Sequence, residues 1–382
     1  MLSGIEIFSG AGGLAKGLEL AGIQHKAFVE INTHACKTLR QNFTKDIVHE
    51  GNIELFNFSK FKDIAIIAGG PPCQPFSLGG KHKGNMDKRD MFPQAIKAIK
   101  QIAPKAFIFE NVKGLLRKSF ASYFNYIILQ LTYPEITIKN DEEWEYHLGR
   151  LEKIHISSPR DVLKYNIMYR LINSADYGVP QKRERVIIVG VRTDIDLSWS
   201  FPKQTHSEES LLWSQFVTKE YWKRHKIEDQ SNSLTTKRLL NRIKRLKHNY
   251  SLFPPPLKAW QTMRDSIGHL PEPTIEGSTA YPDHIFKPGA KIYPGHTGSP
   301  LDSPSKTIKA GDHGVPGGEN MIRFSGERVR YLSVLEAKLI QTFPEDYQIS
   351  GVWSEAMRQI GNAVPVKLAK VIAQDLSREL TQ

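Results

Sequence analysis

The sequence has 382 residues, of which 40% are hydrophobic, and this indicates a globular protein with one large domain and a smaller partner. Lys and Arg exceed Asp and Glu by 52 − 40, and the resulting net charge of +12 favours a polyanionic partner without requiring one. Two cysteines exclude a disulfide framework and a cysteine-based zinc cluster, so we expect no metal site. The chain shows no secretory signal and no apolar run of the roughly 20 residues that cross a bilayer, so we expect a soluble, cytoplasmic protein without a membrane partner.

Short apolar runs alternate with helical patterns through the first half of the chain. We expect strands at residues 5–8, 27–29, 64–68, 106–109 and 186–191, with helices between most of them. This alternation predicts an α/β fold, a Rossmann-like and mostly parallel sheet with helices on both faces. Ligands in such sheets bind beyond the carboxyl ends of the strands, where this chain has its glycine-rich and polar stretches.

A glycine-rich turn follows the first expected strand. It consists of Phe8, Ser9, Gly10, Ala11, Gly12 and Gly13. Backbone N–H groups of such a turn bind anionic ligands, and Glu30, at the end of the next strand, is placed to bind ribose hydroxyls. Because Gly10, Gly12 and Ala15 also satisfy a loose dinucleotide fingerprint, the pattern predicts a nucleotide-containing cofactor and leaves its identity open.

The run at residues 64–68 ends in Gly69-Gly70-Pro71-Pro72, and Cys73 follows directly. A cysteine thiol is a strong nucleophile, and the prolines restrict the backbone that carries it. Most cysteines are instead buried and inert, and Cys36, in a helical run, fits that interpretation. Cys73, set among glycines and prolines at a strand end, indicates a nucleophile.

Further polar side chains flank the next two strands. Glu110 follows the strand at residues 106–109, at the edge where Cys73 lies, and it is either an exposed cap or a contact to a ring bound beside Cys73. Arg183 and Arg185 precede the strand at residues 186–191. Two residues apart on an extended segment, they are expected to project to one face and to clamp a phosphate or a carbonyl oxygen, or else to solvate the start of the strand.

The pattern changes at about residue 200, where prolines become frequent and periodicity fades, and it becomes helical again after residue 326. We therefore expect a first domain at residues 1–198, a loop-rich second domain at residues 199–325, and a segment at residues 326–382 that returns to the first domain. Residues 117–165 form a charged interruption without an assigned role. The basic stretch at residues 237–245 fits a helix that faces phosphates and a solvated charged helix equally well.

Several motifs, taken in order, resemble those of bacterial DNA (cytosine-5)-methyltransferases of the restriction-modification type. The motifs are residues 8–13, 70–77, 110–112, 181–185, 330–336 with 341–344, and 359–365. They span nearly the whole chain, which makes the resemblance specific. It implies the fold of the adenosylmethionine-dependent methyltransferases, S-adenosylmethionine as the methyl donor, double-stranded DNA as the partner, and a target-recognition domain at residues 199–325. It also implies a monomer that binds the DNA of the bacterial nucleoid, and it leaves open whether a cognate restriction endonuclease exists.

The resemblance further implies a role for individual residues. The cofactor pocket would be lined by Phe8, Ser9, Gly10, Ala11, Gly12, Gly13, Glu30, Ile31, Asn52, Ile53, Pro72, Asn362 and Val364. The catalytic residues would be Cys73 as the nucleophile, Glu110 on N3 and the amino group of cytosine, Arg185 on its O2, and Arg183 as a support of the loop. The DNA contacts would include Gln74, Ser77, Lys81, Lys83 and Thr307. Asn52 stands where the family usually has Asp, a change that removes a charge from the contact with adenine.

The implied reaction is sequence-specific methylation of C5 of a cytosine that has been flipped out of the duplex, through addition of Cys73 to C6. Three alternatives remain at this point. An NAD-dependent oxidoreductase would explain the glycine fingerprint but would leave Cys73, Glu110 and Arg185 without a purpose. A DNA-binding regulator would not need a nucleophile. An RNA cytosine-5 methyltransferase of the same family is disfavoured by the long region at residues 199–325, which suits readout of a duplex.

Overall fold

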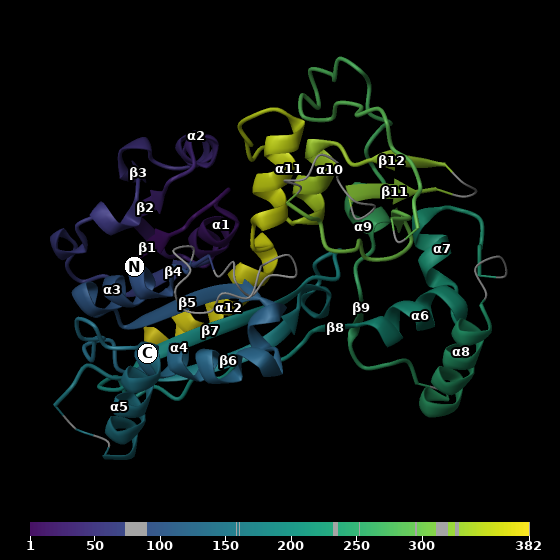
Figure 1. The fold of residues 1–382 in the computed structure, drawn as a ribbon. Helices are drawn as coiled ribbons and strands as arrows, with labels where there is room; N and C mark the ends of the chain where they lie inside the picture. Colours follow the sequence, from purple (N-terminus) through teal and green to yellow (C-terminus); the bar gives the residue numbers. More distant parts are fainter. Residues whose placement is uncertain are drawn as a thin grey trace. The chain divides into compact units, whose positions relative to one another are not determined.

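The computed structural model describes residues 1–72, 90–157, 159, 161–231, 236–251, 253–294, 296–310, 320–324 and 328–381. The chain divides into two compact units (Figure 1). Unit 1 comprises Met1–Ile172, Glu184–Pro202 and Asp346–Gln382, and unit 2 comprises Asn173–Arg183 and Lys203–Glu345. Which function each part of the chain serves stays a prediction.

Unit 1 is built on one mixed sheet. Its strands are β1 (Ser3–Ile7), β2 (Gln24–Glu30), β3 (Val48–Glu50), β4 (Ile66–Gly69), β5 (Ala106–Val112), β6 (Tyr165–Asn173) and β7 (Glu184–Arg192). Within the described residues these seven strands have the order β3-β2-β1-β4-β5-β7-β6. The first five strands in this order are parallel to one another, whereas β7 is antiparallel to β5. The predicted mostly parallel α/β sheet is confirmed.

Helices cover both faces of this sheet. They are α1 (Gly13–Leu20), α2 (Thr33–Asn42), α3 (Phe92–Ile102), α4 (Ala121–Thr132), α5 (Trp144–Ser157), α11 (Trp353–Asn362) and α12 (Val366–Leu380). Short 3-10 turns lie at η1 (Lys45–Ile47), η2 (Ile53–Leu55), η3 (Phe58–Lys60), η6 (Lys113–Leu116) and η7 (Lys118–Phe120). The segment at residues 117–165, which the sequence left without a role, is thus largely helical.

Side chains of β2 show how the two faces differ. Ala27 and Val29 point into the large core that also holds Phe107 of β5, whereas Phe28 between them packs with Cys36 in a smaller cluster under α1 and α2. Successive residues of a strand point to opposite faces, so this alternation buries apolar side chains on both sides. Burial of one such side chain stabilises the fold by roughly 1.5–3 kcal/mol. Because helices cover both faces of the sheet, side chains on both faces contribute to this stabilisation.

The C-terminal segment belongs to unit 1 because α12 packs directly on α1 (Figure 1). The close approach depends on Gly17, where an added Cβ would lie 2.3 Å from the Cβ of Ala369. A side chain at this position would push the two helices apart, at a cost of typically 1–3 kcal/mol. The amphipathic pattern of Val366, Leu368 and Ile372 correctly predicts a buried helix here, and all three side chains are buried.

Unit 2 is more helical than its prolines suggest. Its elements are η8 (Ser174–Tyr177), β8 (His206–Ser207), α6 (Glu208–Phe216), α7 (Glu220–His225), α8 (Lys237–Tyr250), β9 (Lys258–Ala259), α9 (Met263–Ile267), β10 (Ser299–Pro300), β11 (Met321–Arg323), β12 (Val329–Tyr331) and α10 (Val334–Ile340). Trp222 and Tyr221 lie at the centre of one core cluster, and Arg330 forms a buried two-pronged ion pair with Glu336 at 2.8 Å for both contacts. No helix in the described part of the chain is both long and apolar enough to cross a bilayer.

Candidate active site

Four neighbouring strands end at one edge of the sheet and bring the predicted site residues together. The strands β2, β1, β4 and β5 are adjacent and parallel, with Ile7 beside Gly69 and Gly69 beside Phe109. The glycine-rich turn therefore begins next to the Gly69-Gly70 turn, and Glu110 lies on the strand beyond it. All four strands belong to unit 1, so this arrangement lies within one compact unit.

The glycine-rich turn adopts a conformation that depends on its glycines. Phe8, Gly10 and Gly12 have φ values of 55°, 53° and 77°, in the left-handed region that disfavours most side chains. An added Cβ on Gly10 would meet no atom within 4 Å, so the turn is open on this side. On Gly12 the same Cβ would lie 2.6 Å from the hydroxyl of Tyr347, so this side is filled. The turn thus offers one open face to a ligand.

Glu30 organises the turn from the neighbouring strand end. Its Oε2 accepts a hydrogen bond from the Gly10 N–H at 2.7 Å, and its Oε1 accepts from the N–H groups of Ile31 at 2.9 Å and Asn32 at 2.8 Å. A carboxylate has about four acceptor positions, so capacity remains for ligand hydroxyl groups. A buried carboxylate held in this way fits the ribose of a nucleoside cofactor, and Ile31 beside it is 69% exposed.

Asn52 and Ile53 differ in exposure. Ile53 is buried, whereas Asn52 is exposed and caps η2, because its side-chain oxygen accepts from the Glu54 N–H at 3.0 Å. Its amide also donates to the Glu54 carboxylate at 3.2 Å. The adenine contact predicted for Asn52 stays a prediction, and in this conformation its amide is bound within the turn.

Tyr347 fixes the other side of the glycine-rich turn, and no sequence pattern identifies it. Its buried hydroxyl donates to the Ala11 carbonyl at 2.6 Å, and burial raises the pKa of this hydroxyl well above its usual range. Tyr347 is therefore a positioning residue for the turn, supplied from the far end of the chain.

Two predicted cofactor contacts follow Tyr347 in the chain. Asn362 is exposed at the end of α11, and Val364 is buried.

Replacing Tyr347 with phenylalanine removes this one hydrogen bond and keeps the ring. Loss of about 1 kcal/mol of loop stabilisation should raise the Kd for adenosylmethionine, the cofactor that the sequence resemblance implies, about five-fold and leave affinity for the implied DNA partner unchanged. Isothermal titration of both ligands measures the two effects. Tyr250→Phe, which removes the bond that an unrelated tyrosine donates to Glu209, is the matched control. An unchanged cofactor affinity in Tyr347→Phe would exclude this positioning role.

Glu6 is a second residue that the sequence analysis missed. Alternation along β1 turns its carboxyl away from the core of Ile5 and Ile7, toward the start of α1, where it receives the Ala15 backbone N–H. Burial raises the pKa of Glu6 well above its usual range. An acidic residue inside an apolar strand is the signal that could have identified it.

Glu110 and Arg185 form an ion pair at the same edge. The Arg185 Nε lies 2.7 Å from Glu110 Oε1, and both side chains are largely buried, with 15% and 11% of their surfaces exposed. They meet because Arg185 pairs with Val112 across β5 and β7, two residues from Glu110 on the same face. The contact lacks the alignment of a hydrogen bond, so within the described residues Glu110 Oε1 is buried without a hydrogen-bond donor. The pair presents an unsatisfied acceptor beside a cation.

The turn that leads to Cys73 passes close to this pair and is hydrogen-bonded to the neighbouring residue Asn111. The side-chain amide of Asn111 donates to the Pro71 carbonyl at 2.9 Å, and the Met91 N–H donates to the Pro72 carbonyl at 3.0 Å. An added Cβ on Gly70 would lie 3.6 Å from Glu110 Oε2, so the turn passes close to this carboxylate. Cys73 itself, together with the predicted DNA contacts Gln74, Ser77, Lys81 and Lys83, lies outside the described residues.

Cys36 fits the inert interpretation. It lies on the buried side of α2, its thiol donates to the Glu30 carbonyl at 3.4 Å, and burial raises its pKa to about 12. Because the thiolate is the reactive form, Cys36 should remain unmodified when the native protein is treated with iodoacetamide at pH 8. Peptide mass spectrometry should find alkylation at Cys73 alone, and both cysteines should react in denaturant. Modification of native Cys36 at a comparable rate would contradict this description of its surroundings.

Arg183 and Thr307 lie together inside unit 2. The Arg183 side chain is 1% exposed and its Nη1 donates to the Ile308 carbonyl at 3.3 Å. The Thr307 hydroxyl donates to the Lys182 carbonyl at 2.8 Å, and the Ile308 N–H donates to Gln181 at 3.1 Å. The predicted common direction of Arg183 and Arg185 stays a prediction, and each guanidinium has its observed partner within its own unit. The chain between them changes units at residue 184.

The unit 1 edge thus combines a cradle for a nucleoside with a carboxylate and a guanidinium placed for a planar polar ring. Comparisons with known proteins agree with this chemistry. A family model described as C-5 cytosine-specific DNA methylase matches residues 2–134 and 150–378. Type II methyltransferase M.Eco47II of Escherichia coli is 31% identical over 385 residues, which cover 97% of this chain and 78% of that protein.

Two further comparisons cover different shares of the chain. Type II methyltransferase M.NgoMIV of Neisseria gonorrhoeae is 37% identical over 208 residues, 54% of this chain and 57% of that protein. Among solved structures, the S. pombe Dnmt2 methyltransferase has a TM-score of 0.56 at 17% identity, covering 100% of this chain and 99% of that one. The structural likeness concerns the fold alone.

Proposed function

The chain belongs to the C-5 cytosine-specific DNA methylase family, and from this membership we propose how its own residues carry out the reaction. It is a DNA (cytosine-5-)-methyltransferase, and its methyl donor is S-adenosylmethionine. An NAD-dependent oxidoreductase does not account for a family match of this extent, and the full-length similarity to a type II methyltransferase supports DNA over RNA as the substrate. The proposal concerns the roles of individual residues, the recognition of a DNA sequence, and the partners of the enzyme.

The cofactor would be held at the open face of the glycine-rich turn. The turn from Phe8 to Gly13 supplies backbone N–H groups, Glu30 supplies carboxylate acceptors for the ribose, and Pro72 borders the site from the neighbouring turn. The remaining proposed contacts are Ile31, Asn52, Ile53, Asn362 and Val364. Bound there, S-adenosylmethionine supplies an electrophilic methyl group on a positively charged sulfur, and C5 of cytosine takes up this methyl group.

Cys73 would act as the nucleophile. C5 of cytosine is too weakly nucleophilic to react directly, so the Cys73 thiolate adds to C6 and converts the ring to an enamine with electron density at C5. After methylation the proton on C5 leaves, the C6–sulfur bond breaks, and the thiolate is released. Because C6 cannot be reached inside a stacked duplex, the target nucleotide must be flipped out, which costs a few kcal/mol.

Glu110 and Arg185 would stabilise the charge that develops on the ring during addition. Glu110 would bind N3 and the amino group, and Arg185 would bind O2. The ion pair between them at 2.7 Å holds both groups in place before a base arrives, so little reorganisation is needed on binding. Arg183, buried against the Ile308 carbonyl, would support the strand start from unit 2.

Recognition of double-stranded DNA would involve unit 2, which contains Thr307 and most of the predicted target-recognition domain. Gln74, Ser77, Lys81 and Lys83 would contact DNA beside the extruded base. We propose a monomer that acts on bacterial DNA in the cytoplasm and protects a specific sequence against a cognate restriction endonuclease. The full-length similarity to the type II methyltransferase M.Eco47II supports this assignment.

The observation that carries the proposal is the buried pair of Glu110 and Arg185 next to the turn that leads to Cys73. Sequencing 5-methylcytosine in the genome of cells that express the protein tests it. The expected result is modification of C5 at one position of one short sequence. Methylation at N4 of cytosine or at N6 of adenine, or none at all, would contradict the proposal. Purified protein should then transfer labelled methyl groups to that duplex and not to the same sequence as RNA.

A further inference from the structure

Helix α8 concentrates positive charge on unit 2. Its 14 residues include six Lys and Arg and no Asp or Glu, in a chain whose net charge is +12. The helix begins at a cap in which the Thr236 hydroxyl accepts from the Leu239 N–H at 3.2 Å. At a rise of 1.5 Å per residue, it displays these cations over roughly 20 Å.

The apolar side of α8 is already used for packing. Leu246 is buried in a cluster with Leu212 and Trp213 of α6, and Leu239 packs against the same cluster. Tyr250 adds an edge-to-face contact with Trp213 at 6.3 Å between ring centroids. With this side covered, the helix has no free apolar stripe with which to insert into a lipid surface. Its basic side faces away from the packing and has a defined orientation.

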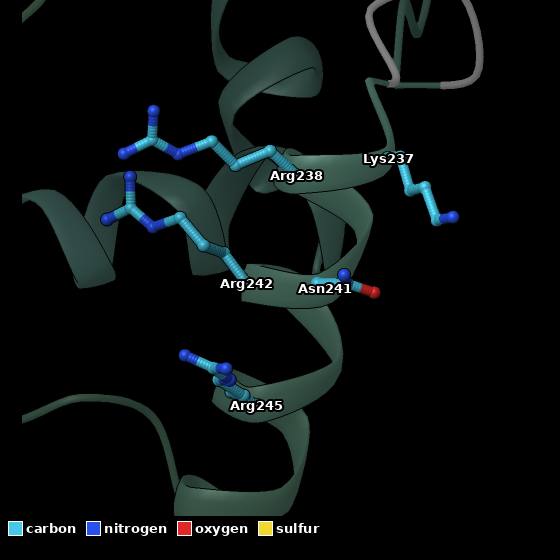
Figure 2. Close-up of a pocket in the computed structure, with 5 residues that line it drawn as sticks. All are labelled: Lys237, Arg238, Asn241, Arg242 and Arg245. Atoms are coloured by element: carbon cyan, nitrogen blue, oxygen red, sulfur yellow. The ribbon is translucent and has the colours of Figure 1, made fainter.

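Within the part of the chain that the structure describes, most cations of α8 are not neutralised by neighbouring carboxylates. Among the described residues, Arg242 has an ion pair, to Glu208 at 2.9 Å, whereas none is found for Lys237, Arg238 and Arg245, which are all exposed. Figure 2 shows Arg238, Arg242 and Arg245 extending to the same side of the helix. With Lys237 and Asn241 they line a hollow of about 560 Å³. An internal ion pair therefore accounts for Arg242, but neither packing nor an ion pair accounts for the exposed positive charges of Arg238 and Arg245.

We propose that α8 binds the phosphodiester backbone of duplex DNA, outside the bases that are read, and so supplies affinity that does not depend on sequence. The inference rests on the proposed function, because the partner is its DNA substrate. Positions 238, 242 and 245 follow the i, i+4, i+7 spacing of one helical face and rise over about 10 Å. Phosphates on one strand follow every 3.4 Å of the duplex axis, so a row of this length can engage several of them.

The salt dependence of DNA binding tests the proposal. In Arg238→Gln/Arg242→Gln/Arg245→Gln, three phosphate contacts are lost, so the slope of log Kd against log salt concentration should become shallower by about 2.7. Between 50 and 200 mM salt, wild type should therefore lose about 40-fold more affinity than the variant. The rate of methyl transfer at saturating DNA should not change, because none of the substituted residues is proposed to contact the cofactor or the target base.

Matched variants separate a local effect from one of net charge. Lys62→Gln/Lys100→Gln/Lys105→Gln removes the same charge from exposed positions near the amino ends of β4 and β5, and its slope should stay close to that of wild type. Arg238→Lys/Arg245→Lys keeps the charge and should keep the slope. Melting temperatures establish that all variants fold.

The proposal is overturned if the α8 variant has the salt dependence of wild type, or if both triple variants change the slope equally. Loss of binding to vesicles that contain phosphatidylserine, with DNA binding retained, would assign α8 to a lipid surface and would equally reject it. In each of these cases wild type still methylates DNA. If wild type itself neither binds nor methylates DNA, it is the proposed function that fails.

Discussion

Replacing Cys73 with serine is expected to lower the rate of methyl transfer by at least about 10³-fold, because a hydroxyl group is scarcely ionised at neutral pH and cannot add to C6. Affinity for the duplex and for adenosylmethionine should remain within a few-fold of wild type, since neither ligand depends on the sulfur for binding. Single-turnover transfer of labelled methyl groups measures the first quantity, and equilibrium titrations measure the other two.

Cys36→Ala is the matched control for this experiment. The Cys36 thiol is buried in the small cluster under α2, away from the proposed reaction, so its loss should reduce stability slightly and activity by no more than a few-fold. Substantial methyl transfer by Cys73→Ser would mean that another group attacks the base. Because the family match does not depend on Cys73 alone, that outcome would reject the assigned nucleophile and leave the class of enzyme intact.

Replacing Glu110 with glutamine is expected to lower the maximal rate by about 10²–10⁴-fold, or roughly 3–5 kcal/mol of transition-state stabilisation. The amide keeps the shape of the side chain, but it cannot balance the charge of Arg185 before the base binds, and it cannot transfer a proton to N3 once the base is bound. Its effect should fall on kcat rather than on KM, because the interaction strengthens as charge develops on the ring. Steady-state kinetics on the unmethylated target duplex separate the two constants.

Glu184→Gln makes the same chemical change at the start of β7. Its carboxylate pairs with Lys113 at 2.8 Å, and both side chains are about half exposed, so this surface pair should contribute little to catalysis. A change of less than two-fold is expected. If Glu110→Gln were to raise KM and leave kcat unaltered, Glu110 would serve only to bind the base, and the proposed stabilisation of the addition step would be wrong.

The core of unit 1 could be predicted from the sequence because its signals are local. Apolar runs such as residues 64–68 correspond to buried strands, and glycines and prolines mark where these strands end. Since parallel strands end at a common edge, finding Glu30 and Glu110 at strand ends was sufficient to expect them at one site. The same reasoning correctly interpreted Cys36 as a buried residue, which the structure places at 0% exposure.

Contacts between distant parts of the chain could not be predicted in this way. The bond from Tyr347 to Ala11 joins residues 336 positions apart, and no local pattern indicates it. Arg183 and Arg185 look equivalent on an extended segment, yet the chain passes from one unit to the other between them. The helix α6 was obscured because the prolines of the surrounding region masked its pattern, whereas the basic stretch at residues 237–245 did predict a helix, now seen as α8. In each case the tertiary environment determines the outcome.

Formation of a covalent adduct tests the central claim most directly. Fluorine at C5 cannot leave as a proton does, so a duplex with 5-fluorocytosine at the target position should trap the protein after addition of Cys73 and methyl transfer. Incubated with adenosylmethionine, wild type should form a complex that survives denaturing electrophoresis, with Cys73 as the modified residue by mass spectrometry. Absence of such a complex, or attachment at any other residue, would contradict the mechanism.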